Sequence, residues 1–183
     1  MKLDNKITPK IKISKLDAAR RQVETVIRLY FHNGDPVSIH TLTAAAYNIL
    51  RDLNKSRGGS PMILKEGIFE QLKPEYHKEI LGKINEAENF FKHADKDPDA
   101  SLDFSPGQSE LLIFEACEKY FQLTGEQVAL FQIYRGWYLA NNVELFKFED
   151  DMKNTIAENA LLAAEMSRLE YFNHCLTLVM QAW

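Results

Sequence analysis

The sequence has no long apolar run and only two cysteines. No stretch approaches the roughly 18 consecutive apolar residues that a transmembrane helix needs. The N-terminus is polar where a secretory signal would have an apolar core. Cys117 and Cys175 both fall within helical patterns among apolar neighbours, so we expect free thiols rather than a disulfide. These absences predict a soluble, cytoplasmic protein that does not associate with membranes.

The short motifs that mark several enzyme classes are missing as well. The sequence has no Gly-x-Ser-x-Gly, no Walker phosphate loop, and neither the Cys-x-x-Cys nor the His-Glu-x-x-His spacing of zinc sites. Di-iron helical bundles need a glutamate three residues before a histidine, and none of the five histidines has one. We therefore predict that the protein binds no cofactor, and whether it is an enzyme stays open.

Basic residues are outnumbered by acidic ones, 22 to 26, and the one obvious basic cluster lies near the N-terminus. The formal net charge is −4, a balance that argues against broad nucleic-acid binding, which needs clustered lysine and arginine. The basic cluster consists of Lys2, Lys6, Lys10, Lys12 and Lys15. Ser14 and Asp17 have the spacing of a helix-capping box. We expect residues 1–13 to be a flexible lead-in and residues 14–183 to form a single helical domain.

Apolar residues recur every three or four positions along nearly the whole chain, and no run alternates like a β-strand. Glycine, proline and asparagine interrupt the pattern. The uninterrupted segments predict helices within 14–33, 38–57, 74–94, 109–123, 126–139 and 144–152, and from 155 onward. Gly136 lies inside the fifth of these, where it would serve the close approach of two helices. We predict an all-α fold, a single-domain bundle of six or seven helices.

The most distinctive polar stretch is AENFFKHADKDPD, residues 87–99. At about 100° per residue, Glu86, Asn89 and His93 share one helical face beside an apolar stripe. Histidine suits proton transfer near neutral pH, so Asn89 and His93 are candidate catalytic residues. The loop that follows, residues 95–109, would be able to close over this face. A purely structural explanation is also open, in which these are ordinary polar positions near a helix end.

Two other groups of residues invite a metal site. His32, Asp35 and His40 cluster around the first turn between helices, and two imidazoles with a carboxylate are a common set of metal ligands. They are candidate metal ligands, and a metal-binding helical protein is one alternative function. The aspartates that follow residue 94 do not form a calcium-binding EF-hand, because Ala100 and Pro106 stand where that loop needs glycine and glutamate.

A late segment resembles the motif of the HEPN family, all-α proteins in which an arginine is followed, after four to six residues, by a histidine. Arg168-Leu-Glu-Tyr-Phe-Asn-His174 fits that spacing. Asn89-Phe-Phe-Lys-His93 is similar to the second half of the motif, with Glu88 in place of arginine. The resemblance implies a bacterial, metal-independent ribonuclease, or an RNA- or nucleotide-binding protein, of a toxin–antitoxin or defence system. It also implies a homodimer with motifs facing across a cleft, where Arg168 and His174 activate a ribose hydroxyl.

The stretch from Phe172 to Trp183 is strongly apolar, and the chain has 11 phenylalanines, 7 tyrosines and 2 tryptophans. A free helix of this composition would expose an apolar patch, so it must pack on its own domain or on a second subunit. We therefore predict a homodimer, with a surface that would also suit a protein partner. The leading interpretation is a binding or regulatory module, with no catalytic apparatus in evidence.

Overall fold

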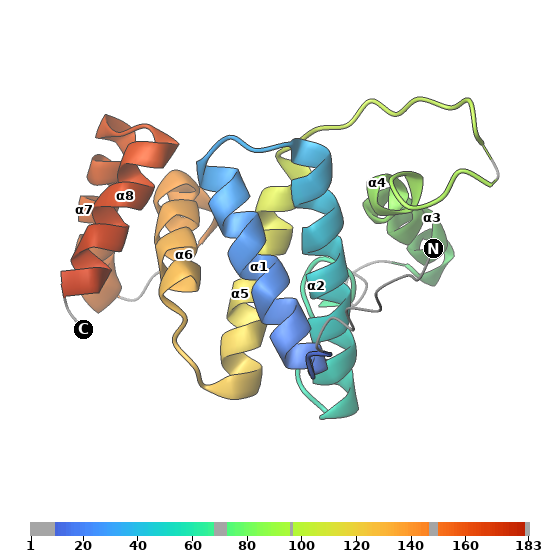
Figure 1. The fold of residues 1–183 in the computed structure, drawn as a ribbon, viewed down its shortest axis with the longest axis horizontal. Coiled ribbons are helices and arrows are strands. Elements are labelled where there is room, and N and C mark those ends of the chain that lie inside the picture. Colours follow the sequence, from blue (N-terminus) through green and yellow to red (C-terminus); the bar gives the residue numbers. More distant parts are fainter. Residues whose placement is uncertain (1–9, 68–72, 96, 147–149, 182–183) are drawn as a thin grey trace, which may run out of the picture.

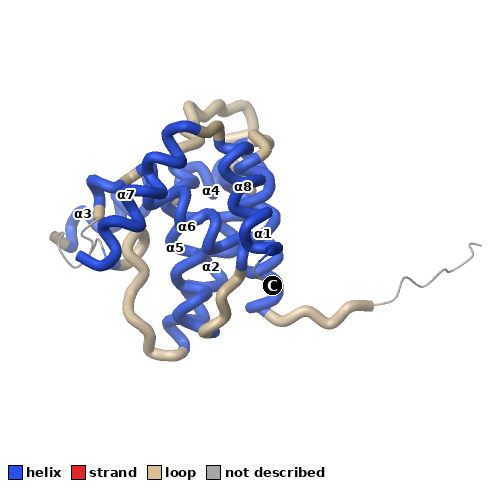
Figure 2. The backbone as a smooth tube through the Cα atoms, turned by 90° about the vertical axis from the view of Figure 1, so that its left-hand side faces the viewer, coloured by secondary structure: helices blue, strands red, loops and turns tan. Residues whose placement is uncertain are grey.

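The computed structural model describes residues 10–67, 73–95, 97–146 and 150–181, and within these ranges it is helical without a β-strand (Figure 1 and Figure 2). The helices are α1 Lys15–Phe31, α2 Pro36–Ser56, α3 Pro74–Ile84, α4 Glu86–Phe90, α5 Gln108–Thr124, α6 Ala129–Asn141, α7 Asp150–Glu165 and α8 Arg168–Gln181, with a 3-10 turn at Val143–Leu145. The predicted all-α bundle is confirmed. The described ranges hold one α-helix more than the upper expectation, because the helices predicted over residues 74–94 and from 155 onward are each divided in two. The separate helix predicted over 144–152 is wrong: the described residues there form the 3-10 turn and the first residues of α7.

Four helices form the centre of the molecule. α1 packs against α2, α5 and α6, and α2 packs against α5. Figure 1 shows the remaining helices at the two ends: α7 and α8 cover α6 at one end, and α3 and α4 lie beyond α2 at the other. Among the described residues, no helix combines the length and the apolar character needed to cross a membrane.

α1 begins where the sequence predicted. The Ser14 hydroxyl accepts a hydrogen bond from the Asp17 amide (3.0 Å), and the Asp17 carboxylate accepts one from the Ser14 amide (3.1 Å), which completes the capping box. The buried face of this helix consists of Ala19, Val23, Val26, Ile27, Tyr30 and Phe31. Burial of such a stripe, at about 25 cal/mol per Å² of apolar surface, is the main force that holds α1 in the bundle.

α2 begins two residues earlier than the sequence predicted. The Asp35 carboxylate accepts a hydrogen bond from the Ser38 amide (2.7 Å) and so caps the helix. Pro36 occupies the first turn, where its missing N–H leaves no hydrogen bond unmade. The Asp35 side chain is therefore engaged in starting α2.

The helix predicted over residues 74–94 is divided at Asn85. This residue ends α3 and begins α4 with φ −95° and ψ 1°, outside the helical region. α4 ends at Phe90, although the His93 amide still donates to the Asn89 carbonyl (3.1 Å) and continues the turn. The periodicity did not reveal the break, because the apolar positions on both sides of Asn85 keep helical spacing.

Aromatic rings fill much of the core. Phe31 packs edge to face on Tyr30, with ring centres 5.5 Å apart, and it stacks on Phe172 of α8 at 4.8 Å. These contacts join the first helix to the last. Both cysteines are free, as predicted: Cys117 is buried and Cys175 is half-buried.

Gly136 of α6 permits the close approach that the sequence predicted. A Cβ atom at this position would lie 2.9 Å from Tyr171 Oη and 3.4 Å from Asn159 Nδ2. The Gly136 carbonyl accepts a hydrogen bond from the Asn159 amide group (2.7 Å), which in turn accepts one from the Tyr171 hydroxyl (2.9 Å). α6, α7 and α8 therefore meet at a point that leaves no room for a side chain.

Candidate functional site

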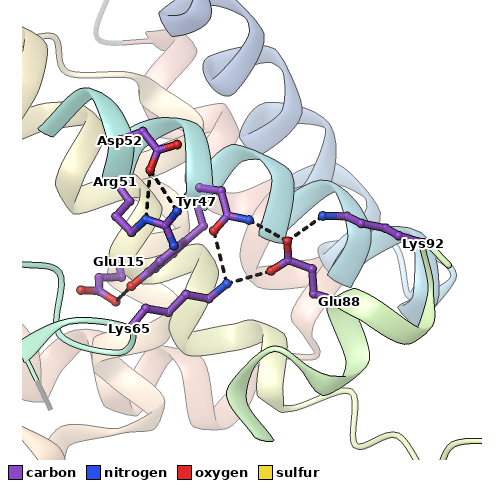
Figure 3. Close-up of polar contacts among 8 residues, drawn as sticks. Tyr47, Arg51, Asp52, Lys65, Glu88, Lys92 and Glu115 are labelled. Carbon is purple, nitrogen blue, oxygen red and sulfur yellow. Dashed lines mark hydrogen bonds and ion pairs between the residues drawn. The ribbon is translucent and has the colours of Figure 1, made fainter. Parts of the chain in front are cut away.

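A buried ion pair fastens α4 to the bundle (Figure 3). Glu88 of α4 accepts hydrogen bonds from Lys65 Nζ (2.7 Å) and Lys92 Nζ (2.6 Å). Asn48 of α2 donates to the same carboxylate (2.6 Å) and accepts from Lys65 Nζ (3.3 Å). Lys65 is 5% exposed and Glu88 is 7% exposed. Charges removed from water to this degree need close partners, so the pair fixes where α4 sits.

The surroundings of Glu88 keep it ionised. Burial alone raises the pKa of this carboxyl group, but the hydrogen bonds and charges of Lys65 and Lys92 outweigh it and lower the pKa from 4.5 to about 2. Burial lowers the pKa of Lys65, and the hydrogen bond and charge of Glu88 counter this only in part. Glu88 faces two ammonium groups, whereas Lys65 faces one carboxylate. The charge of Lys65 therefore depends on Glu88.

A second buried carboxylate, Glu115 of α5, fixes the segment that carries Lys65. Glu115 accepts hydrogen bonds from the Tyr47 hydroxyl (2.9 Å), from the Leu64 amide (3.2 Å) and from the Ile63 amide. Burial, and then the charge of Glu115, raises the pKa of Tyr47, so its hydroxyl remains a donor. Figure 3 shows Lys65 running from beside Glu115 toward Glu88. The two carboxylates thus hold one segment against α2, α5 and α4.

The anchored helix turns its opposite face to a pocket of about 670 Å³, which we call the α4 pocket. Glu86, Phe90 and His93 lie about 140–160° from Glu88 around the helix, and Asn89 lies about 100° from it. The pocket is lined by Gly82, Glu86, Asn89, Phe90, His93, Asp95, Asp97, Ala100, Ser101 and Leu102. The structure therefore brings together the face that the sequence singled out and places the following loop beside it.

Three carboxylates, from Glu86, Asp95 and Asp97, line this pocket. All three residues are exposed, and none forms an ion pair with a residue that the structure describes. Phe90 and Leu102 add apolar surface to the same lining. A concave surface with negative charge and an aromatic ring suits a cation attached to an apolar body.

His93 and Asn89 are exposed in the α4 pocket, and their side chains make no hydrogen bond within the described ranges. General acid–base catalysis by histidine relies on a partner that fixes the tautomer and the direction of the ring. No described residue fixes the His93 ring in this way. The arrangement has the composition of a binding pocket more than that of an acid–base pair.

Arg168 and His174 lie on one helix but in different surroundings. The Arg168 guanidinium lies 4.2 Å from the centre of the Tyr30 ring and donates to the Tyr30 carbonyl (3.3 Å). His174 is exposed. Six residues turn an α-helix by about 600°, which leaves the two side chains roughly 120° apart around α8. A single copy of the chain therefore does not bring them together.

The three candidate metal ligands each have a separate environment. Asp35 caps α2, and His32 Nδ1 donates to the Arg28 carbonyl at the end of α1 (2.8 Å). His40 is buried and is hydrogen-bonded to Ser109 (3.0 Å). In the described part of the chain, no group of three or more histidine, cysteine, aspartate or glutamate residues is arranged to hold a metal ion. The geometry of these residues does not support the metal-binding alternative.

Sequence reasoning missed the buried network. The spacing of Glu88 and Lys92 is that of an ordinary surface pair, and it gives no sign of Lys65, which comes 23 residues before Glu88 in a weakly patterned segment. Glu115 did carry a signal. It interrupts the apolar run LLIFEAC at residues 111–117, and a charged group in such a run needs buried partners.

No protein-family model, no curated protein and no solved structure matches the chain. The function of the protein therefore has to be argued from the geometry and charge of its own residues.

Proposed function

We propose that the protein is a binding module whose α4 pocket takes up a basic segment of a partner protein. The observation that carries this proposal is the set of three carboxylates, from Glu86, Asp95 and Asp97, that line one pocket and form no ion pair with a described residue. They are not arranged as metal ligands within the described residues. Arginine and lysine side chains supply the missing charge, and a guanidinium group also stacks on rings such as that of Phe90.

The anchoring of α4 supports this role. Binding is stronger when the site does not have to be ordered first, because ordering side chains costs free energy. The buried bonds of Glu88 to Lys65 and Asn48 hold α4 in place before any partner arrives. The carboxylates themselves are exposed, and each exposed ion pair contributes about 0.2–1 kcal/mol. Three such pairs with one exposed cation–π contact sum to at most about 4 kcal/mol, which corresponds to a dissociation constant on the order of 1 mM.

Fluorescence anisotropy with a labelled peptide tests the proposal. The probe is a short peptide with three arginines separated by leucines, and its control carries citrulline, an uncharged near-isostere, at the arginine positions. We expect the arginine peptide to bind and the citrulline peptide not to bind. Binding should weaken as salt is added, because exposed charges are screened. Equal binding of the two peptides would contradict the proposal.

Matched variants locate the interaction in the α4 pocket. The triple variant Glu86→Gln, Asp95→Asn, Asp97→Asn should weaken binding of the arginine peptide at least tenfold. The double variant Asp99→Asn, Asp103→Asn removes two exposed carboxylates of the same loop that do not line the pocket, and it should leave binding within about twofold. Equal losses in both variants would show a general charge effect instead of a site.

We also propose that two copies associate through the end of the molecule formed by α7 and α8. Leu161 of α7 is 67% exposed and Leu178 of α8 is 53% exposed, and apolar side chains are stabilised when an interface removes them from water. Light scattering at tens of micromolar should give twice the 21.1 kDa chain mass. Leu161→Glu with Leu178→Glu should give the monomer, whereas Leu145→Glu, at a position 64% exposed, should not. A monomeric unmodified protein would contradict the dimer.

The second candidate function is an HEPN-like ribonuclease. The observation that favours it is that Arg168 and His174 lie on one helix with His174 exposed, so a second copy would be able to present its own motif to the first. Single-stranded RNA incubated with the protein and a metal chelator should then be cleaved. His174→Ala should abolish cleavage and His93→Ala should not. Intact RNA after prolonged incubation would exclude this candidate.

A further inference from the structure

We propose that a second, smaller cavity binds a zwitterion of the amino-acid class. The cavity has a volume of about 240 Å³ and lies where the turn between α1 and α2 meets the first residues of α5 and α8. It shares no lining residue with the α4 pocket, and this inference does not depend on the function proposed above. The residues that matter here are Tyr30, Pro36, Ile39, Pro106, Glu110 and Arg168.

The cavity has one positive side chain, Arg168, and one negative side chain, Glu110, and Tyr30 contacts both. The Arg168 guanidinium lies over the ring and donates to the main-chain oxygen of Tyr30 (3.3 Å). Glu110 Oε1 accepts a hydrogen bond from the Tyr30 hydroxyl (3.0 Å), which also accepts one from Trp137 Nε1 (3.3 Å). The cation and the anion are thus attached to different ends of one fixed tyrosine. They line the same cavity without forming an ion pair with each other.

Both charged groups have unused capacity for hydrogen bonds. Arginine has five N–H donors, and among the described residues the side chain of Arg168 donates only to Tyr30. Glu110 Oε2 accepts no hydrogen bond from the described residues. Both residues are half-buried and line the cavity, so their unused donors and acceptor are open to a ligand. A ligand with both charges can pair with both residues at once.

The size and walls of the cavity select the ligand class. A carboxylate can accept two parallel hydrogen bonds from Arg168, while an ammonium group can donate to Glu110. The cavity is smaller than the roughly 300–1,000 Å³ of sites for drug-sized ligands, so it fits one amino acid and excludes a nucleotide. A phosphate group would in addition be repelled by Glu110. Pro36, Ile39 and Pro106 provide an apolar wall for an aliphatic side chain.

Calorimetry and thermal unfolding with the twenty standard amino acids test this proposal on the full chain. Two half-molecules of leucine serve as matched probes: isocaproate keeps the carboxylate without the ammonium group, and isoamylamine keeps the ammonium group without the carboxylate. We expect at least one aliphatic amino acid to bind at least tenfold more tightly than either half-molecule. The proposal is overturned if none of the twenty binds at 10 mM, or if a half-molecule binds as tightly.

Single variants test whether the ligand binds through the charged side chains of Arg168 and Glu110. Arg168→Gln and, separately, Glu110→Gln should each weaken binding at least tenfold, whereas Arg21→Gln, at an exposed arginine of α1, should leave it unchanged. Circular dichroism checks that each variant folds. If Arg168→Gln does not fold, Glu110→Gln decides the comparison, and the half-molecule test on the unmodified protein does not depend on either. Unchanged binding in a folded Arg168→Gln or Glu110→Gln variant would overturn the proposal.

Discussion

Replacing Glu88 by glutamine should destabilise the protein far more than replacing Lys92, its neighbour on the same turn. The Lys65 side chain is 2% exposed, and without the Glu88 carboxylate it has no anionic partner among the described residues and is left with amide oxygens such as Asn48 Oδ1 at 3.3 Å. Removing one partner of a buried pair costs about 3–5 kcal/mol. This cost has an upper limit, because Lys65 can instead lose its proton. Neutralising a lysine with the ordinary pKa of 10.5 at pH 7 takes about 5 kcal/mol. We therefore expect Glu88→Gln to cost about 3 kcal/mol.

The matched variants differ in what they leave behind. Lys65→Met leaves Glu88 with Lys92 and Asn48, so its cost should be about 1–2 kcal/mol. Lys92→Met removes a side chain that is 33% exposed and should cost less than about 1 kcal/mol. The double variant Lys65→Met, Glu88→Gln removes both buried charges and should be more stable than Glu88→Gln alone.

Urea unfolding followed by circular dichroism measures these free energies. The pH dependence gives an independent check on Glu88. Its pKa is lowered from 4.5 to about 2, so its contribution is complete above pH 4.5 and is lost as the pH falls toward 2. That contribution amounts to at most about 3 kcal/mol, and Glu88→Gln should lack it. Costs below about 1 kcal/mol for Glu88→Gln, or additive costs in the double variant, would refute the buried-pair explanation.

Three further predictions concern other parts of the core. Gly136→Ala should lower the free energy of unfolding by about 1–3 kcal/mol in the same urea assay, because the added Cβ would clash with Tyr171 Oη. Gly82→Ala should be neutral or stabilising, because a Cβ at that position has no atom within 4 Å. Tyr47→Phe should cost about 1–2 kcal/mol, since it removes a donor from buried Glu115, and a loss below about 0.5 kcal/mol would contradict that role. Burial lowers the pKa of His40 below 6.5, so the free energy of unfolding should fall as the pH drops below 6.5. This residue contributes at most about 1.4 kcal/mol per pH unit, and His40→Leu should reduce the slope when unfolding is measured at several pH values.

Local patterns in the sequence were sufficient to predict α1, α2, α5 and α6 and one face of the α4 pocket. The capping box of Ser14 and Asp17 depends on residues three apart, and the shared face of Glu86, Asn89 and His93 depends on spacings of three and four. Helical geometry alone decides such relations. The break at Asn85 was not predicted, because it leaves the spacing of the apolar residues unchanged.

Contacts between distant segments were beyond prediction from periodicity. Lys65 reaches Glu88 from a weakly patterned segment, and Arg168 reaches Tyr30 across 138 residues of chain. Both contacts depend on how whole helices pack, and packing brings together residues that share no local pattern. For the same reason the sequence grouped Arg168 with His174 on one helix, while the fold places the Arg168 guanidinium over the ring of Tyr30.

The polar attachment of α4 determines how this end of the molecule responds to solvent. Glu88 connects α4 to Asn48 and Lys65 through charges and amides. Opening this contact would also expose Ala87 and the Phe91 ring that packs on His40, but far less apolar surface than unfolding the bundle, so it should depend less on urea concentration than global unfolding does. Acid, by contrast, acts on it directly through Glu88. Acidic solution should therefore release α4 while the aromatic core of the bundle still gives cooperative unfolding in urea.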